Sequence, residues 1–364
     1  MSGPLAGIRA LDFTELLPGP FLTQALVEMG AEVTKVERPP KGDGVRTSSP
    51  GVFAAVNRGK RSLLLDLKTE AGRAEAMALA DRADLVIEGY RPGVMDRLGL
   101  GWDQVQARNP RAIYLSLSGY GQTGPMRLVP GHDLNYLANA GITALCGEPE
   151  GPPAHPIGLP VADLGGAIYG LSAVLAALFQ RERTGRGQYL DLALADCMAH
   201  WANARRANFH GRGLADLPAQ RRAALTRPAY GVFPVADGWI TIAALETHFF
   251  KALVRLLDLP ELQDPSLDTP PARVAWAEEI NAAVAAGLAP LTRDAAVALL
   301  LDHDIPAAPV LSPAEADASP HFQARGLARP TAAGPLTPFP VRLEGMASAL
   351  PDAPALDAGR ETAR

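Results

Sequence analysis

Short apolar segments of strand length alternate with segments of helix length through the first two hundred residues. The first unit places a strand at residues 8–13, then a helix at residues 21–29 that Gly30 ends, and a second strand at residues 33–36. Further strand-like runs follow at residues 62–65, 85–87 and 112–117. This alternation predicts an α/β fold with an open, mostly parallel sheet and helices on both faces.

A change in composition predicts a second, smaller domain. Residues 205–229 are rich in Arg and Ala and end in Arg227-Pro228, which indicates a linker. Beyond it, Ala236-Asp237-Gly238 separates two apolar runs, which predicts a β-hairpin. We therefore expect a large α/β domain over residues 1–204, a small α+β domain over residues 230–325, and a C-terminal segment, residues 326–364, that completes the large domain.

The charge and cysteine content narrow the function classes. The chain of 364 residues carries a formal net charge of −5, so no overall positive field favours nucleic acid. Cys146 and Cys197 are the only cysteines, too few for a disulfide framework or a zinc site. The N-terminus has no export-signal pattern, and apolar runs such as residues 170–179 fall short of the roughly 20 residues of a membrane span. We expect a soluble cytoplasmic protein without a membrane partner.

His132 and Asp163 are the candidates for proton transfer. His132 lies in the run Gly131-His132-Asp133-Leu134-Asn135-Tyr136, and Asp163 precedes Leu164-Gly165-Gly166 at a predicted helix start. An imidazole and a carboxyl group facing each other across a substrate would carry a proton between them. The alternatives are a structural histidine and a helix-capping aspartate. Glu246 opens a later helix, where it is either a partner for the imidazole or an acid favoured by the helix dipole.

Basic residues gather near the predicted strand ends, where open parallel sheets bind ligands. They are Arg38, Lys60, Arg61, Lys68, Arg91 and Arg97. Arg forms bidentate contacts with phosphate, although a solvated rim is the alternative for each residue. The chain has neither a G-x-G-x-x-G after its first strand nor a P-loop, which disfavours a dehydrogenase and a nucleoside triphosphatase. The histidine spacing predicts no metal site.

Several motifs together resemble the class III CoA-transferase family, the CaiB/BaiF type. They are Pro4-Leu5-Ala6-Gly7-Ile8-Arg9, Pro18-Gly19-Pro20, Gly30-Ala31-Glu32-Val33, Glu37-Arg38-Pro39, Glu88-Gly89-Tyr90-Arg91-Pro92-Gly93, Gly119-Tyr120-Gly121-Gln122-Thr123-Gly124-Pro125 and Thr184-Gly185-Arg186-Gly187-Gln188. The resemblance runs from residue 1 to about residue 250. It implies an interlocked homodimer whose active site lies between the large domain of one chain and the small domain of the other.

Within the family, the chain resembles the alpha-methylacyl-CoA racemase branch at three places. They are the run around His132, Asp163 and the segment Ala244-Leu245-Glu246. The resemblance implies proton carriers at His132 and Asp163 on opposite faces of the substrate, with Glu246 pairing with His132. It also implies contacts to coenzyme A, which is part of the substrate and not a separate cofactor. These would come from Arg38, Leu65, Lys68, Arg91, Arg97, Asp133 and Tyr136. Ala162, Leu164 and Thr247 depart from the racemase pattern and put the shape of the acyl pocket in doubt.

These residues predict a racemase or epimerase of 2-methylacyl-CoA thioesters that works by α-proton abstraction and return through an enolate. The alternative is a class III CoA-transferase, in which Asp163 attacks an acyl-CoA and the coenzyme passes to another carboxylate. A further alternative is a CoA-binding protein without turnover. The acyl chain and the pathway are not specified by the sequence.

Overall fold

The computed structural model describes residues 3–156, 158–343 and 350–360. Contacts divide the chain into two compact units. The large unit holds residues 1–143, 156–203 and 319–364, and the small unit holds residues 144–155 and 204–318. Residues 205–229, expected as a linker, contain the helices α10 (Asn203–Gly211) and α11 (Leu217–Leu225) and fall within the small unit.

The large unit is built on a six-stranded sheet in which all neighbouring strands run parallel. In spatial order the strands are β3 (Arg61–Leu64), β2 (Glu32–Glu37), β1 (Arg9–Phe13), β4 (Leu85–Glu88), β5 (Ile113–Ser118) and β6 (Tyr189–Ala193). The predicted α/β class and parallel sheet are confirmed, and the edge strand β6 was not foreseen. The strand order reverses between β1 and β4, where open α/β sheets form a ligand crevice at the carboxyl ends of their strands.

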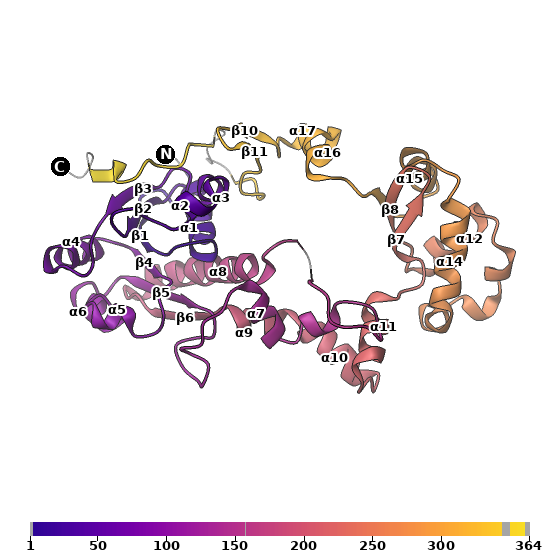
Figure 1. Cartoon of the computed structure of the whole chain (residues 1–364), viewed down its shortest axis with the longest axis horizontal. Helices are drawn as coiled ribbons and strands as arrows, with labels where there is room; N and C mark the ends of the chain where they lie inside the picture. Colours follow the sequence, from indigo (N-terminus) through magenta and orange to yellow (C-terminus); the bar gives the residue numbers. More distant parts are fainter. Residues whose placement is uncertain (1–2, 157, 344–349, 361–364) are drawn as a thin grey trace. The chain divides into compact units, whose positions relative to one another are not determined.

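Helices accompany this sheet along the chain (Figure 1). Those that fall within the large unit are α1 (Pro18–Glu28), α2 (Val45–Ser48), α3 (Pro50–Val56), α4 (Glu70–Ala80), α5 (Val94–Arg97), α6 (Trp102–Arg108), α7 (Asp133–Asn139), α8 (Val161–Thr184), α9 (Leu194–Trp201) and α17 (Pro320–Arg325). The short 3-10 helix η1 (Thr143–Leu145) lies at a boundary between the two units.

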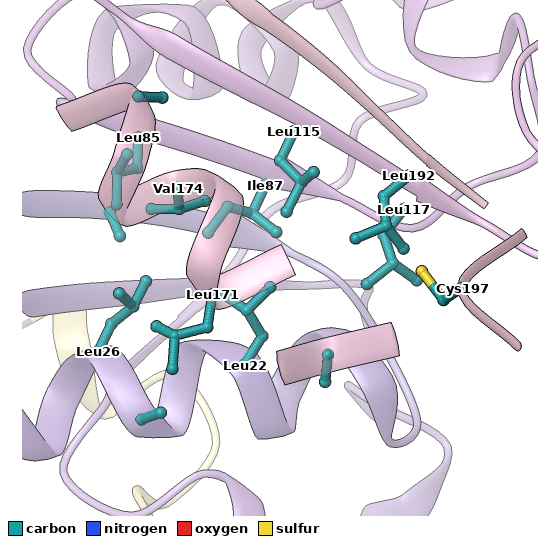
Figure 2. Packing of buried hydrophobic residues seen from close by; sticks show 14 of the residues in the cluster. Leu22, Leu26, Leu85, Ile87, Leu115, Leu117, Leu171, Val174, Leu192 and Cys197 are labelled. Carbon is teal, nitrogen blue, oxygen red and sulfur yellow. The ribbon is translucent and has the colours of Figure 1, made fainter. Parts of the chain in front are cut away.

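Two apolar cores lie on opposite faces of the sheet because side chains alternate along each strand. In β4, Leu85 and Ile87 belong to the core that α1 and α8 share, and Val86 belongs to the core beside α4 and α6. Figure 2 shows the first of these cores, where Leu22 and Leu26 of α1 approach the β4 side chains. A strand that is buried on both faces has apolar residues at successive positions of its sequence. For this reason β4 and β5 could be predicted.

Helix α8, of 24 residues, crosses the first core. By length and composition alone it also meets the criterion for a membrane span, but half of its most apolar window is buried inside the protein. A Cβ atom at Gly170 would lie 2.5 Å from the Leu22 Cδ1 atom, and one at Gly166 would lie 2.2 Å from the Leu194 Cδ2 atom. Glycine at these two positions therefore lets side chains of α1 and α9 pack closely against α8.

The small unit contains a three-stranded antiparallel sheet and a set of helices. The strands are β7 (Tyr230–Val235), β8 (Gly238–Ala243) and β9 (Ala307–Pro309). The β7–β8 hairpin turns at Ala236-Asp237, as predicted, whereas β9 was not foreseen. The remaining elements are α12 (Thr247–Leu256), η2 (Pro260–Leu262), η3 (Pro265–Leu267), α13 (Pro270–Arg273), η4 (Val274–Trp276), α14 (Ala277–Leu288), α15 (Arg293–Asp302) and α16 (Pro313–Ala318).

The C-terminal segment packs on the large unit, as expected for a tail without periodicity. After the hairpin of β10 (Arg329–Thr331) and β11 (Gly334–Leu336), it reaches β3 and forms η5 (Ala358–Arg360). The Leu64 amide donates to Asp357 Oδ1 at 2.7 Å, and the Gly59 amide donates to the Asp352 carbonyl at 2.9 Å. The tail therefore supplies partners for backbone groups at the edge of the sheet.

Candidate active site

Asp133 joins the starts of two helices. Its carboxylate accepts hydrogen bonds from the amides of Ala162 at 2.6 Å and Asp163 at 3.1 Å. The first amides of a helix have no partners within the helix, and Pro160 at the N-cap of α8 has no side-chain acceptor to offer them. A residue 29 positions earlier in the chain thus caps α8, and it fixes Asp163 relative to α7.

Asp163 lies in the first turn of α8, inside the helix and not at its N-cap. The capping alternative for this residue is therefore wrong. Burial, together with the smaller effect of the negative charge of Asp133, raises the pKa of Asp163 to about 7. Near neutral pH this carboxyl group exists in both its acid and its carboxylate form.

His132 occupies the N-cap position of α7 with an extended backbone. Its amide donates to Asn135 Oδ1 at 2.9 Å, which fixes the turn into the helix. The imidazole is exposed in the large unit. The histidine is therefore held at the start of α7 by its backbone, and it is exposed and not part of the core.

A cavity of about 440 Å³ lies at the carboxyl ends of β4 and β5. Its lining includes Arg91, His132 and Tyr136, so three of the predicted site residues meet there. The Tyr136 hydroxyl donates to the Gly131 carbonyl at 2.5 Å. Burial raises the pKa of Tyr136 to about 12, with a contribution from the charge of Asp163, so the phenol stays protonated. Asp163 itself is not among the residues that line this cavity.

The other predicted coenzyme residues follow β2, β3 and β4. Arg38 is two-thirds exposed, with its Nη2 atom 3.9 Å from Glu15 Oε2, and Lys68 and Arg97 are also exposed. Leu65 is 3% exposed, so only its backbone is available to a ligand there. These positions suit an anionic ligand at the strand ends, and coenzyme binding by them stays a prediction.

Lys60 does not belong to this group, because its ammonium is fully buried. It donates to Asp12, Thr23, Asn57 and the Pro20 carbonyl at 2.7–3.2 Å. The prediction that Lys60 lies on a solvated or ligand-binding rim is therefore wrong. A lysine with four acceptors in the interior holds the start of α1 to the sheet.

Glu246 belongs to the small unit, at the N-cap of α12. Its side chain is exposed, and its carbonyl accepts the Phe250 amide. The predicted role of Glu246 as partner of His132 stays a prediction.

Three residues of the cavity wall were not singled out in advance. Tyr120 packs edge-on against Tyr136 with ring centroids 5.3 Å apart, and Arg127 and Asn135 complete that side. Tyr120 lies within a motif that carried the family resemblance, so the sequence contained a signal for it. Arg127 lies outside these motifs, and the sequence contained no signal for it. Among the described residues, no cluster of three or more His, Cys, Asp or Glu side chains suits a metal ion.

A family model described as CoA-transferase family III matches residues 5–360. The chain belongs to CoA-transferase family III. It is 34% identical to the acetyl-CoA:oxalate CoA-transferase of Acetobacter aceti, over 98% of this chain and 93% of that protein. It is 33% identical to the succinate–glutarate CoA-transferase of Agrobacterium fabrum, over 89% of this chain and 84% of that protein.

Solved structures of the family have the same fold. A CAIB/BAIF family protein from Brucella suis superimposes with a TM-score of 0.87 at 33% identity, covering 100% of this chain and 99% of that chain. The resemblance to CoA-transferase family III is thus confirmed. The racemase branch is not: these named relatives are CoA-transferases, which favours the alternative put forward from the sequence.

Proposed function

We propose that this family III member moves coenzyme A from an acyl-CoA to a second carboxylic acid, with Asp163 as the nucleophile. The observation that carries the proposal is the state of Asp163, a partly buried carboxyl group in the first turn of α8, with its pKa raised to about 7. A carboxylate of raised pKa is a stronger nucleophile than an ordinary one and is still substantially ionised near neutral pH. The transferase names of the relatives support the same reaction.

The chemistry has four balanced steps. The Asp163 carboxylate attacks the thioester carbonyl and releases the coenzyme A thiolate, leaving a mixed anhydride. The thiolate then attacks the Asp163 carbonyl, which frees the first acid and leaves an aspartyl thioester. The second acid attacks this thioester and again releases the thiolate. Finally the thiolate takes the new acyl group, and the Asp163 carboxylate is restored.

The surroundings of Asp163 suit charge that forms and disappears in these steps. The carboxyl group lies at the N-terminus of α8, and the N-cap of the adjacent α7 is His132 on the cavity wall. Helix N-termini stabilise negative charge through the helix dipole. Arg91 and Arg127, which also line the cavity, add positive charge for a carboxylate or phosphate.

A second candidate is the racemase or epimerase of 2-methylacyl-CoA thioesters. One observation favours it: the exposed imidazole of His132 lies on the cavity wall, one residue from the carboxylate that caps the helix of Asp163. A transferase needs no imidazole at this position. In the racemase reaction, His132 and Asp163 would exchange one α-proton without forming a covalent intermediate.

Trapping and isotope exchange separate these candidates. The chain is mixed with an acyl-CoA and quenched with hydroxylamine, which converts an acylated Asp163 to a hydroxamate that peptide mass spectrometry identifies. The same acyl-CoA, as a single 2-methyl epimer, is incubated in heavy water. A hydroxamate at Asp163 with no α-deuterium supports the transferase, whereas α-deuterium without a hydroxamate supports the racemase. A protein that binds coenzyme A and gives neither product is a binding protein without turnover.

The matched controls are Asp163→Asn and Asp294→Asn. Asp294 is an exposed acid in the first turn of α15, so its substitution repeats the charge change at another helix start. The transferase requires that Asp163→Asn abolishes the hydroxamate and that Asp294→Asn leaves it intact.

We further propose that the active protein is a homodimer and that Glu246 completes the site of the partner subunit. This proposal depends on the family resemblance, and complementation tests it. Two inactive variants, Asp163→Ala and Glu246→Ala, are mixed under subunit exchange. Activity equal to about a quarter of that of the wild-type protein supports a shared site. No recovery of activity excludes it.

A further inference from the structure

Glu88 is a buried acid at the carboxyl end of β4, and its side chain is only 4% exposed. Burial raises the pKa of Glu88 to about 7, and hydrogen bonding by the Ser116 hydroxyl and the Tyr90 amide offsets burial only in part. Its charged neighbours Asp96 and Asp191 are themselves acids and raise the pKa further. An apolar side chain would be less costly to bury, which indicates that this carboxyl group serves something other than packing.

The carboxyl group holds the loop that follows β4. Glu88 Oε2 accepts a hydrogen bond from the Tyr90 amide at 2.8 Å. On the other side of the loop, the Arg91 carbonyl accepts from the Val94 amide at 3.1 Å. Pro92 lies between these contacts, and its ring fixes its own φ angle. The backbone at Arg91 is therefore fixed from both sides.

This loop forms part of the wall of the candidate active site. Tyr90, Arg91 and Pro92 line the 440 Å³ cavity, together with His132. The Arg91 side chain is exposed, so its guanidinium is accessible to a ligand. A guanidinium pairs well with a phosphate or a carboxylate, and the pairing is strongest where its direction is fixed in advance.

A second cavity, of about 190 Å³, lies next to the same loop. Its lining includes Glu88 and Arg91, so Arg91 borders both cavities. Asp96 and Asp103 also line the second cavity. A guanidinium turned into this cavity would meet these acids and leave the 440 Å³ cavity without its charge. The direction of Arg91 therefore depends on the backbone conformation that Glu88 holds.

We propose that Glu88 is a positioning residue that directs Arg91 into the 440 Å³ cavity, toward an anionic group of the acyl-CoA. This inference rests on the proposed function, because it takes acyl-CoA as the ligand of the cavity. The role of Glu88 is to supply an acceptor for the Tyr90 amide. Arg91 contacts substrate and transition state alike, so loss of its position raises the KM for acyl-CoA and leaves kcat nearly unchanged.

Two substitutions separate the acceptor from the bulk of the side chain. Glu88→Leu removes the acceptor, whereas Glu88→Gln retains an oxygen that can accept from the Tyr90 amide. We expect the Kd for free coenzyme A, measured by calorimetry, to rise about tenfold in Glu88→Leu and to stay near the wild-type value in Glu88→Gln. An unchanged Kd in Glu88→Leu, or an equal rise in both variants, overturns the proposal.

Asp264→Leu is the matched control. Asp264 Oδ1 accepts from the amide of Ser266, two residues further on, at 2.7 Å, and both residues belong to the small unit. The substitution thus removes a contact of the same spacing elsewhere in the chain. A rise in Kd equal to that of Glu88→Leu would show a general effect of such substitutions and would overturn the proposal.

A double-mutant cycle tests whether Glu88 acts through Arg91. Glu88→Leu should raise the Kd in the wild-type background and not further in the Arg91→Ala background, so additive effects overturn the positioning role. Glu88→Met replaces Glu88→Leu in the cycle if the latter does not fold, because methionine adapts to irregular space. Failure of both variants to fold would show that Glu88 serves the fold, and would also overturn this role.

The same measurements keep this inference apart from the proposed function. Wild-type chain that fails to bind coenzyme A contradicts the ligand assignment itself. Normal coenzyme binding without acylation of Asp163 contradicts only the proposed transferase.

Discussion

Two carboxyl groups of the large unit, the buried Asp12 and the partly buried Asp163, have opposite electrostatic surroundings. Burial alone would raise the pKa of Asp12, but the charges of Lys60 and Lys35 and the Thr14 and Thr23 hydroxyls lower it to about 2. Asp163 has the Asp133 carboxylate as its charged neighbour, and its pKa is raised to about 7. A carboxylate whose charge is balanced by cations and hydrogen bonds stabilises the fold. A carboxylate without such partners is available for chemistry.

The largest expected effect is loss of activity in Asp163→Asn. The amide has nearly the shape of the carboxyl group but is not a nucleophile, so kcat should fall by at least about a thousandfold. Steady-state transfer of coenzyme A to an acceptor acid measures this. A decrease of less than tenfold would remove Asp163 from the chemistry.

Asp12→Asn should change stability instead of chemistry. It leaves Lys60 buried without its counter-charge, which costs about 3–5 kcal/mol of unfolding free energy. Urea denaturation measures this cost. Activity per folded molecule should stay near that of the wild type, and a selective loss of kcat in folded protein would break the contrast between the two carboxyl groups.

The raised pKa of Asp163 should make the stability of the fold depend on pH. The pKa of Asp163 is raised above its unfolded value, so ionisation of Asp163 destabilises the fold as pH rises from about 4 to about 7. Asp163→Asn should therefore raise the melting temperature at pH 8 and leave it nearly unchanged at pH 4. An equal shift at both pH values would show that the pKa is not raised.

Much of the scaffold around Asp163 was predictable from local patterns. The runs at residues 85–87 and 112–117 are apolar throughout because β4 and β5 are buried on both faces. The edge strand β6 was missed because its first three residues are exposed or partly exposed and Asp191 interrupts its apolar sequence. The helices of residues 205–229 were missed because few of their side chains are buried, so no apolar period marks them.

The site was predictable only in part. His132 and Asp163 were found from their residue types and from the family motifs. The cap that joins them was not, because Asp133 reaches the amides of Ala162 and Asp163 through the tertiary fold and no local spacing encodes that contact. For the same reason Lys60 was misplaced: its four acceptors come from separate segments of the chain.

Asp133→Ala should have a moderate effect on both stability and chemistry. It removes the cap of α8, which costs about 1 kcal/mol, and it removes the charge that helps to raise the pKa of Asp163. The acidic limb of the kcat profile, set by ionisation of Asp163, should then move to lower pH. Asp133→Asn, which retains an oxygen acceptor, should move the profile with less loss of stability. An unmoved profile in both variants would show that Asp133 serves only as a cap.

Thr23→Val should affect stability and leave the chemistry unchanged. The Thr23 hydroxyl donates to Asp12 Oδ2 at 2.7 Å and accepts from Lys60 at 2.7 Å, so its loss should cost about 1–2 kcal/mol of unfolding free energy. Chemical denaturation gives the value. An unchanged free energy of unfolding would show that the Thr23 hydrogen bonds do not stabilise the charges of Asp12 and Lys60.

Oxygen-18 transfer tests the central claim about Asp163 most directly. Wild-type protein is given an acyl-CoA and an acceptor acid labelled with ¹⁸O in its carboxylate, and the peptide that contains Asp163 is weighed after turnover. In the proposed steps the bridging oxygen of the second anhydride stays on the aspartate, so this peptide gains one ¹⁸O atom. Turnover of labelled acceptor to its acyl-CoA with no ¹⁸O in the peptide would contradict the account.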